Sequence, residues 1–405
     1  MKRREFIISS AIAVGGTALL TGCGKKEIIK RDGEVAKRKF RDLEIPLLGF
    51  GCMRLPMQGD EVDTKEVDRM VDYCMEHGVN YFDTAYMYVD ERSELVMGKS
   101  LKRYKREDFI LTDKLTKDYF KNEEEIRPFF ESQLELTGVK YFDYYLMHAL
   151  DKGNYDHFQK YNAFKVASEL KKEGKIKHLG ISFHDNEETL ERILTDHPEI
   201  EIVQIQFNYI DYDSPSVRSK KVYDVCRKFN KPILIMEPVK GGALVRLPDK
   251  AKEIFDKLNH GSYASYAIRY AASFDGVYKV LSGMSDFEQM KDNVSYMKEF
   301  TPLNEEEYKA IDKVKEILKS LGGIPCTACR YCVEGCPMGI PIPDLFACYN
   351  ARKQFKDWNS SMYYNIYTSE NGKASSCVRC GQCEEVCPQH LHIRELLEKV
   401  SKEFE

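Results

Sequence analysis

The chain has 405 residues, of which 43% are hydrophobic and 31% are charged. Most domains contain about 50 to 250 residues and α/β barrels can be larger, so we expect one large domain and one smaller module. The 61 basic and 65 acidic residues leave a net charge of −4, and both signs are interspersed. Proteins that bind the phosphate backbone concentrate positive charge on one surface. The composition therefore argues against nucleic acid as a partner.

The first 23 residues (1–23) have the layout of an export signal. Basic residues open the chain, a mostly apolar run covers residues 6–20, and small residues precede Cys23. This order is typical of a secretory signal peptide. RREFI at residues 3–7 resembles a twin-arginine signal, and LTGC at residues 20–23 resembles a bacterial lipobox, whose cysteine becomes the lipidated first residue. We therefore expect an exported protein, anchored to the membrane on the periplasmic or outer side of a bacterium.

Two other interpretations of the amino terminus stay open. One is a membrane-spanning helix, although the apolar run is shorter than the roughly twenty residues that a bilayer requires and contains two glycines. The other is a basic, disordered tail on a cytoplasmic protein. Residues 24–38 are polar and lysine-rich, which suits a tether between a lipid anchor and the folded part of the chain. The twin-arginine route carries folded proteins, so it suits a chain that receives its cofactors in the cytoplasm.

Short apolar or β-branched runs alternate with segments of helical spacing between residues 39 and 320. The predicted strands are IPLLGFG (45–51), VNYFD (79–83), FILTD (109–113), DYYLMH (143–148), KHLGISF (177–183), IVQIQFN (202–208), PILIME (232–237) and VYKVLSG (277–283). Strands that alternate with helices form parallel sheets, and eight such units fit a (β/α)8 TIM barrel. An open, doubly wound sheet is the alternative, but the G-x-G-x-x-G loop that it would normally present is missing from the sequence. We expect the barrel over residues 39–320.

Polar residues follow three predicted strands at their carboxyl ends, where the catalytic groups of such barrels lie. The second strand ends at Asp83, with Tyr88 in the loop that follows, the third ends at Lys114, and the fourth ends at His148. A phenol has a pKa of about 10, and a neighbouring ammonium lowers it by favouring the phenolate. Lys114 is therefore expected to lower the pKa of Tyr88, with Asp83 keeping Lys114 charged. Tyr88 would pass its proton to a carbonyl oxygen as hydride reaches the carbon, and His148 would orient that oxygen.

These residues resemble the catalytic tetrad of the aldo-keto reductases, and the likeness covers roughly residues 39–315. The Asp, Tyr, Lys and His of that family fall on the same four positions, in the same order. The resemblance implies reversible hydride transfer between a nicotinamide cofactor, NADH or NADPH, and a small carbonyl or alcohol substrate. Taken singly, each residue also has a structural explanation, such as a helix cap for Asp83 or a solvated side chain for Lys114.

The same resemblance places the cofactor across the mouth of the barrel. The expected cofactor contacts are Gly51, Ser182, Gln204, Met236, Pro238, Gly241, Gln289 and Asn293. The family's asparagine after the serine is absent, and Met236 occupies the position of an aromatic ring that usually stacks on the nicotinamide. Backbone amides near Gly241 suit the pyrophosphate. Many members carry cations for the 2′-phosphate of NADPH at the positions of Gly283 and Gln289, so the choice between NADH and NADPH stays open.

Two blocks near the carboxyl terminus share one cysteine spacing. CTACRYCVEGCP at 326–337 and CVRCGQCEEVCP at 377–388 both follow C-x2-C-x2-C-x3-C-P, the bacterial ferredoxin spacing for [4Fe-4S] clusters. In this pattern three close cysteines hold one cluster and the fourth reaches the other. We assign one cluster to Cys326, Cys329, Cys332 and Cys387, and the second to Cys377, Cys380, Cys383 and Cys336.

Zinc and disulfides are the alternatives for these cysteines. Zinc sites typically use paired C-x2-C knuckles separated by longer loops, and cysteines three residues apart in a tight turn are poorly placed to pair with one another. Between Cys336 and Cys377 lie 40 residues, with helical spacing over 343–358. This layout resembles a helical dicluster ferredoxin, which we expect over residues 321–405. Four further cysteines are expected to be ordinary semi-buried thiols: Cys52, Cys74, Cys226 and Cys348.

As a whole the chain resembles the ferredoxin-fused branch of the aldo-keto reductases. We therefore expect an oxidoreductase whose clusters exchange electrons with a partner protein. The alternative is an electron-transfer protein whose barrel serves as a docking body without turnover. Nicotinamides transfer two electrons as hydride and clusters transfer one at a time, and no flavin site that would convert between them is recognisable in the sequence.

Overall fold

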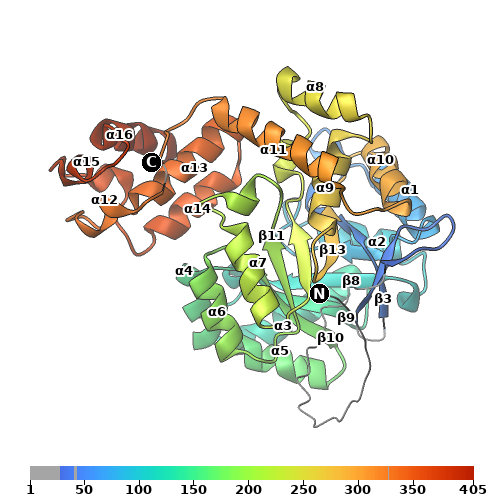
Figure 1. Cartoon of the computed structure of the whole chain (residues 1–405). Helices are drawn as coiled ribbons and strands as arrows, with labels where there is room; N and C mark the ends of the chain where they lie inside the picture. The colour runs from blue at the N-terminus through green and yellow to red at the C-terminus, as the bar shows by residue number, and fades with distance from the viewer. Residues whose placement is uncertain (1–27, 41–42, 327) are drawn as a thin grey trace, which may run out of the picture.

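The computed structural model describes residues 28–40, 43–326 and 328–405, so the expected signal and lipobox (1–23) lie outside the described residues. The described chain forms a large α/β barrel with a smaller helical domain beside it (Figure 1). No helix in these three ranges has both the length and the apolar character that a bilayer crossing demands.

Eight parallel strands close into the barrel in the order β4, β7, β8, β9, β10, β11, β12 and β13, and β13 pairs with β4. Their bounds are β4 (Leu48–Gly51), β7 (Tyr81–Asp83), β8 (Ile110–Leu115), β9 (Phe142–Leu150), β10 (Ile176–Phe183), β11 (Ile202–Gln206), β12 (Ile233–Met236) and β13 (Val277–Ser282). The predicted (β/α)8 fold is confirmed. Because all eight strands are parallel, their carboxyl ends form one mouth of the barrel.

Apolar side chains lie in two layers, one inside the barrel and one around it. Tyr81, Tyr144, Ile202 and Leu234 belong to a compact inner cluster. A larger outer cluster lies between the strands and the surrounding helices. Since the strands are buried on both faces, their sequences are nearly continuous apolar runs.

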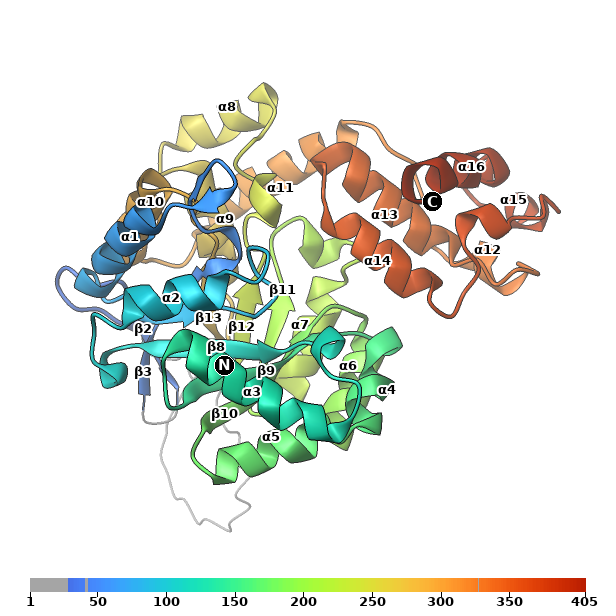
Figure 2. The same cartoon turned by 180° about the vertical axis from the view of Figure 1, so that it is seen from behind.

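Helices surround the strands on the outside of the barrel (Figure 2). They are α1 (Thr64–Glu76), α2 (Ser93–Leu101), α3 (Glu123–Thr137), α4 (Lys152–Lys160), α5 (Ala163–Lys172), α6 (Glu187–Asp196), α7 (Ser219–Lys228), α8 (Asp249–Leu258), α9 (Tyr263–Ala272), α10 (Phe287–Lys298) and α11 (Glu305–Ser320). Asp63, Asn122 and Asn186 each cap a helix by accepting a hydrogen bond from a backbone N–H in its first turn. Gly138 ends α3 in the left-handed conformation that favours glycine.

The expected tether over residues 24–38 is wrong from Ile28 onward. A three-stranded antiparallel sheet contains β1 (Ile28–Ile29), β2 (Lys37–Phe40) and β3 (Leu43–Pro46). Val35 and Ala36 are fully buried, and their N–H groups donate to the carbonyls of His77 and Met297. Buried Arg38 also donates to the carbonyls of Ala272 and Val277, so apolar burial and hydrogen bonds together attach this stretch to the barrel. A second hairpin, β5 (Met57–Gln58) and β6 (Glu61–Val62), follows β4.

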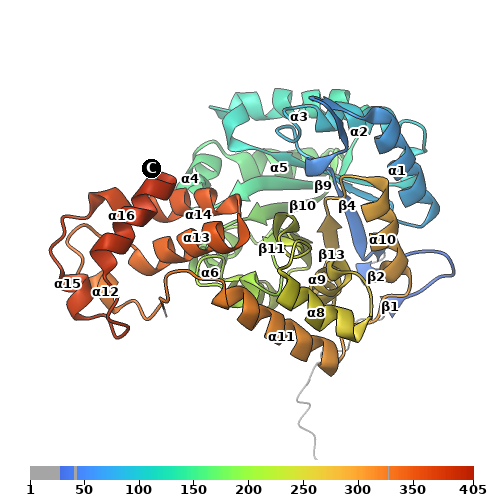
Figure 3. The same ribbon diagram turned by 90° about the horizontal axis from the view of Figure 1, so that it is seen from above.

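The carboxyl-terminal domain is helical and has its own core. It contains α12 (Tyr331–Glu334), α13 (Ile342–Phe355), α14 (Asn359–Thr368), α15 (Gln382–Glu385) and α16 (Ile393–Phe404). Leu345, Phe346, Leu397 and Val400 are buried in a cluster separate from that of the barrel. In all three views α13 and α14 lie nearer the barrel, and α12 and α15 lie farthest from it (Figure 3).

The two domains contact each other at the mouth of the barrel. The Tyr363 hydroxyl in α14 donates to Gln206 Oε1 at the end of β11, at 3.0 Å. Lys240, in the loop after β12, lies 2.7 Å from Asp357, which is between α13 and α14. Since Gln206 ends β11 and Lys240 follows β12, the helical domain lies on the rim where active sites form.

Candidate active site and cluster sites

Asp83 and Lys114 form a buried ion pair at the barrel mouth. Asp83 ends β7, Lys114 lies in the neighbouring strand β8, and Nζ lies 2.5 Å from Asp83 Oδ1. The ammonium also donates to the carbonyl of Thr84 at 2.7 Å and lies 4.6 Å from the ring centre of Tyr88. Burial opposes the charge on Lys114, but Asp83 and Tyr88 outweigh it and hold the pKa of Lys114 above its ordinary value.

Burial sets the direction of the net pKa shift of Tyr88. Burial raises the pKa of Tyr88 to about 12, and Lys114 lowers it by less than burial raises it. Lys114 thus acts on the pKa in the expected direction, but desolvation of the phenolate outweighs the neighbouring ammonium. At neutral pH Tyr88 is a protonated phenol, which suits a proton donor.

His148 lies beside Tyr88 and is neutral. The two rings meet edge to face with their centres 5.7 Å apart. Burial lowers the pKa of His148 well below its ordinary value, and Lys114 and His184 lower it further. Its Nδ1 forms a 2.6 Å hydrogen bond with the hydroxyl of Thr116. When Thr116 donates in this bond, Nε2 carries the proton and is the donor available to a ligand.

Three buried residues of the expected cofactor set make polar contacts within the protein. Gln204 donates to Asp83 Oδ2 at 3.0 Å, so it joins the ion pair of the tetrad. Ser182 Oγ accepts from the N–H of Ala149 at 2.9 Å and keeps its own O–H as a donor. Asn293 Oδ1 accepts from Ser282 Oγ, and the Asn293 amide nitrogen keeps its donors. Each of the three therefore retains at least one N–H or O–H group that can donate a further hydrogen bond.

The other expected cofactor residues surround the same mouth. Gly51 ends β4 beside the backbone of Ser282, Met236 ends β12, and Pro238 is buried in the following loop. Gly241 follows in the left-handed conformation, with φ of 59°. Gln289 is exposed, and its side chain accepts from the N–H of Ser285 and donates to Asp286. Glycine has no side chain, so the backbone at Gly51 and Gly241 can lie close to a bound dinucleotide. Gln289 is uncharged and offers no positive charge to a phosphate.

Sequence reasoning missed Arg54, which follows β4. A Cβ atom built on Gly241 would lie 3.4 Å from Arg54 Nη2, and one built on Gly283 would lie 3.6 Å from Arg54 Cδ. Arg54 therefore reaches across the loops after β12 and β13, where the cofactor was expected. The only available signal was a lone cation in GFGCMRLP, directly after the first strand of the barrel.

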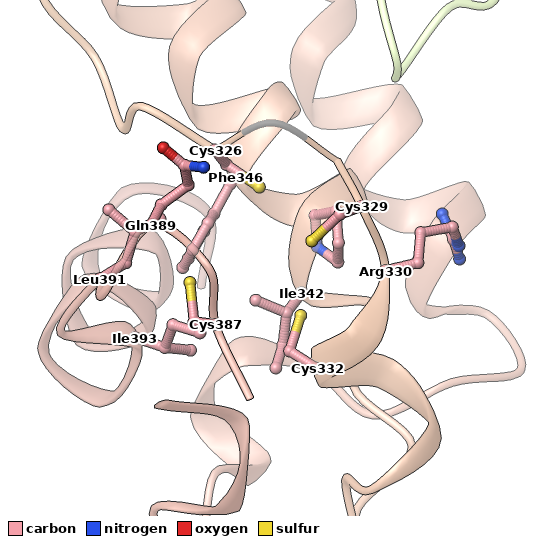
Figure 4. A pocket seen from close by; sticks show the side chains of 11 residues that line it. Cys326, Cys329, Arg330, Cys332, Ile342, Phe346, Cys387, Gln389, Leu391 and Ile393 are labelled. Atoms are coloured by element: carbon pink, nitrogen blue, oxygen red, sulfur yellow. The ribbon is translucent and has the colours of Figure 1, made fainter. Parts of the chain in front are cut away.

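The eight spaced cysteines surround two cavities in the carboxyl-terminal domain. Cys326, Cys329, Cys332 and Cys387 line the first, where the four sulfurs point toward a common space (Figure 4). Cys336, Cys377, Cys380 and Cys383 line the second. Each cavity thus takes three thiols from one block and one from the other, in the predicted arrangement. Two sets of four thiols fit two [4Fe-4S] clusters.

The described cysteines outside the two cavities are buried thiols. Cys52, Cys74, Cys226 and Cys348 are all buried, and every cysteine of the described residues is a free thiol. In the same part of the chain, no three His, Cys, Asp or Glu side chains are grouped closely enough to hold a single metal ion. The thiols instead face one another across cavities, as ligands of a multi-iron cluster do.

Comparison with known families agrees with this geometry. A model described as "Aldo/keto reductase family" matches residues 47–316. The chain belongs to the aldo/keto reductase family. A second model, described as "4Fe-4S dicluster domain", matches residues 325–391, which include all eight spaced cysteines. This aldo/keto reductase therefore carries a carboxyl-terminal dicluster ferredoxin domain.

Similar proteins match part of this chain. A probable aldo-keto reductase of Glycine max is 28% identical over 49% of this chain and 57% of its own length. An uncharacterized oxidoreductase of Bacillus subtilis is 25% identical over 68% of this chain and 95% of its own. The holo form of an aldo-keto reductase from Bacillus halodurans superposes with a TM-score of 0.57 and 26% identity, covering 71% of this chain and 96% of that one.

A further structure supports the fold alone. An aldo-keto reductase from Klebsiella pneumoniae, in complex with NADPH, has 18% identity and a TM-score of 0.56 over 68% of this chain and 92% of its own. This chain matches only part of two of these relatives. It covers 57% of the length of the Glycine max protein and 46% of the length of an aldo-keto reductase from Gibberella moniliformis.

Proposed function

We propose that the chain is an oxidoreductase that transfers hydride between a nicotinamide cofactor and a small carbonyl or alcohol, and that its two [4Fe-4S] clusters transfer electrons. The observation that carries the proposal is the buried group of Asp83, Lys114, Tyr88 and His148 at one barrel mouth. Membership of the aldo/keto reductase family supports it.

The tetrad divides the proton chemistry among its members. A bound nicotinamide supplies or accepts the hydride at the substrate carbon. Tyr88 donates its phenolic proton to the carbonyl oxygen as the C–H bond forms, and His148 donates a hydrogen bond to the same oxygen. Lys114, fixed by Asp83, stabilises the phenolate that Tyr88 becomes. In alcohol oxidation each proton moves in the opposite direction.

The two cavities supply thiolates for the clusters. Cys326, Cys329, Cys332 and Cys387 would hold one cluster, and the other four spaced cysteines would hold the second. Cys329 and Cys380 are exposed, and they shortly precede α12 and α15, the helices that lie farthest from the barrel (Figures 1 and 3). This placement suits exchange of single electrons with an external partner protein.

The deciding test is direct binding of the cofactor. NADH and NADPH are titrated separately into cluster-loaded protein that lacks residues 1–23, and the bound fraction is measured by equilibrium dialysis. Binding of either one at micromolar concentration is the expected result. If neither binds at millimolar concentration, the barrel is a docking body and the chain is an electron-transfer protein. The same titration measures the preference between NADH and NADPH. The sequence leaves this preference open, because Gly283 and Gln289 provide no cation for a 2′-phosphate.

We also propose that the chain is exported through its twin-arginine signal and anchored by a lipid on Cys23. The support is the order of basic, apolar and small residues over 1–23. Labelling of bacterial cells with a palmitate analogue, followed by fractionation, tests it. The wild-type protein should be labelled and recovered with membranes, and Cys23→Ala should remove the label. An unlabelled wild-type protein in the cytoplasmic fraction would mean that the signal is not used.

A further inference from the structure

Two residues from opposite ends of the chain meet over Gly241 at the barrel mouth. Trp358 belongs to the ferredoxin domain, and its indole Nε1 would lie 3.3 Å from a Cβ built on Gly241. Arg54 follows the first barrel strand, and its guanidinium lies 5.7 Å from the Trp358 ring centre and 3.4 Å from the same Cβ position. An arginine and an indole N–H, both of them donors, therefore lie beside bare glycine backbone.

Trp358 is held in place by a buried ion cluster between the domains. Lys240 Nζ lies 2.7 Å from Asp211 Oδ1 and 2.7 Å from Asp357 Oδ2, and all three side chains are at most 3% exposed. Asp357 directly precedes Trp358, and its second oxygen accepts from the N–H of Asn359. The turn between α13 and α14 is thus attached to the loop after β12, and the position of Trp358 over Gly241 follows from that attachment.

Arg54 is loosely paired in the described structure. Its ion pair is with Glu237 Oε1 at 4.0 Å, which exceeds hydrogen-bond length. The other oxygen of that buried carboxyl, Glu237 Oε2, has no hydrogen-bond partner among the described residues. A weakly bound guanidinium beside a glycine turn suits an incoming anion, because arginine binds phosphate oxygens through paired N–H groups.

We propose that Arg54 and Trp358 form a clamp on the diphosphate of the dinucleotide, so that the cofactor site of the barrel is complete only with the ferredoxin domain attached. The inference rests on the proposed function, since the clamp needs a dinucleotide to hold. Arg54 pairs with phosphate oxygens, the indole N–H of Trp358 donates a further hydrogen bond, and the ring covers the diphosphate from solvent. A covered cofactor dissociates slowly, which suits an exported enzyme without a replenished cytoplasmic supply.

The test compares clamp variants with a matched surface variant in the full, cluster-loaded protein. Arg54→Met removes the cation, Trp358→Phe removes the N–H while keeping a ring, and Arg192→Met removes an arginine exposed on α6. The dissociation constants and release rates of NADPH, NADH and ADP are measured, with iron content as a check on folding. ADP is included because it carries the diphosphate without the nicotinamide.

A charge-assisted hydrogen bond contributes enough to binding for its loss to be measured as a change of about tenfold or more. Arg54→Met should therefore weaken all three ligands at least about tenfold, and Trp358→Phe should weaken them about threefold to tenfold and speed their release. Arg192→Met should bind like the wild type. Because the chain has one tryptophan, acrylamide quenching of its emission should fall when ADP binds.

The possible failures are distinguishable. If the wild type binds a dinucleotide and both clamp variants bind it equally well, with unchanged tryptophan quenching, the clamp is wrong and the proposed function stands. If the wild type binds no dinucleotide, the proposed function and the clamp both fail. If only Arg54→Met weakens binding, Trp358 is no part of the site and the two-domain inference is overturned.

Discussion

The barrel mouth and the cluster domain differ in how completely their functional side chains are paired and buried. In the barrel, Lys114 and Asp83 are already paired and almost wholly buried, and Gln204 holds the second oxygen of Asp83. In the cluster domain, thiols line two cavities, and Cys329 and Cys380 are exposed. The barrel thus supplies a dry, preorganised environment that suits the proton and hydride transfer we propose. The cluster domain supplies ligands near the surface, where single electrons can leave.

The comparison predicts that the cluster domain depends on its metal and the barrel does not. Cys332→Ser removes a thiolate from the first cavity, so we expect loss of about half of the iron and loosening of α12 and α13, because cluster binding stabilises the fold. Iron analysis and circular dichroism measure this. Cys348→Ala is the control, since this buried thiol of α13 lines neither cavity. Full iron retention in Cys332→Ser would contradict the assignment of this cysteine.

Tyr88→Phe should break the barrel chemistry and leave the clusters intact. Loss of a positioned proton donor typically costs about a hundredfold to ten-thousandfold in rate. We expect kcat for carbonyl reduction to fall by about that factor, with the dissociation constant of the dinucleotide and the iron content unchanged. Steady-state kinetics with a small aldehyde provide the measurement. A variant that reduces carbonyls at the wild-type rate would remove Tyr88 from the mechanism.

The buried contact between the domains should contribute strongly to stability. Lys240→Met leaves Asp211 and Asp357 buried without their cation, and such losses cost about 3–5 kcal/mol. Urea unfolding measures the change in the free energy of unfolding. Lys220→Met is the control, because its pair with Asp224 lies on the exposed surface of α7 and contributes about 0.5 kcal/mol or less. Equal stabilities of the two variants would show that the domains do not depend on this contact.

The pKa of Tyr88 predicts a difference between the two reaction directions. Burial raises the pKa of Tyr88 to about 12; Lys114 lowers it, Asp83 and Cys52 raise it, and the neutral His148 ring packs against the phenol. Reduction requires the protonated phenol, so its rate should not change through Tyr88 between about pH 6 and 9. Oxidation requires the phenolate, so its rate should rise by up to about tenfold per pH unit over the same range. A reduction rate that falls with an apparent pKa near neutrality would contradict a buried, protonated Tyr88.

Sequence patterns predicted the parts of the protein whose chemistry is local. The cysteine spacing sets both four-thiol groups, because three of every four cysteines lie within one short block. The strand ends gave the tetrad, because eight parallel strands bring their carboxyl ends together. The tether was wrong because burial of Val35 and Ala36 depends on contacts with His77 and Met297.

Other features arise only in the folded chain. Arg54 and Trp358 are some 300 positions apart, and no spacing in the sequence indicates that they meet over Gly241. The direction of the Tyr88 pKa shift also depended on the balance between burial and the Lys114 ammonium, which sequence alone does not give. Residues 1–23 remain a sequence-based prediction.

Transfer of deuterium tests the central claim most directly. The cluster-loaded protein is incubated with NADH or NADPH that carries deuterium at the transferable position, together with a small aldehyde, and the alcohol product is analysed by mass spectrometry. We predict one deuterium at the carbinol carbon for each cofactor oxidised, and labelled alcohol formed about a hundredfold to ten-thousandfold more slowly with Tyr88→Phe. An alcohol without deuterium, or no alcohol from the wild type across a panel of small aldehydes and ketones, would contradict hydride transfer in this barrel.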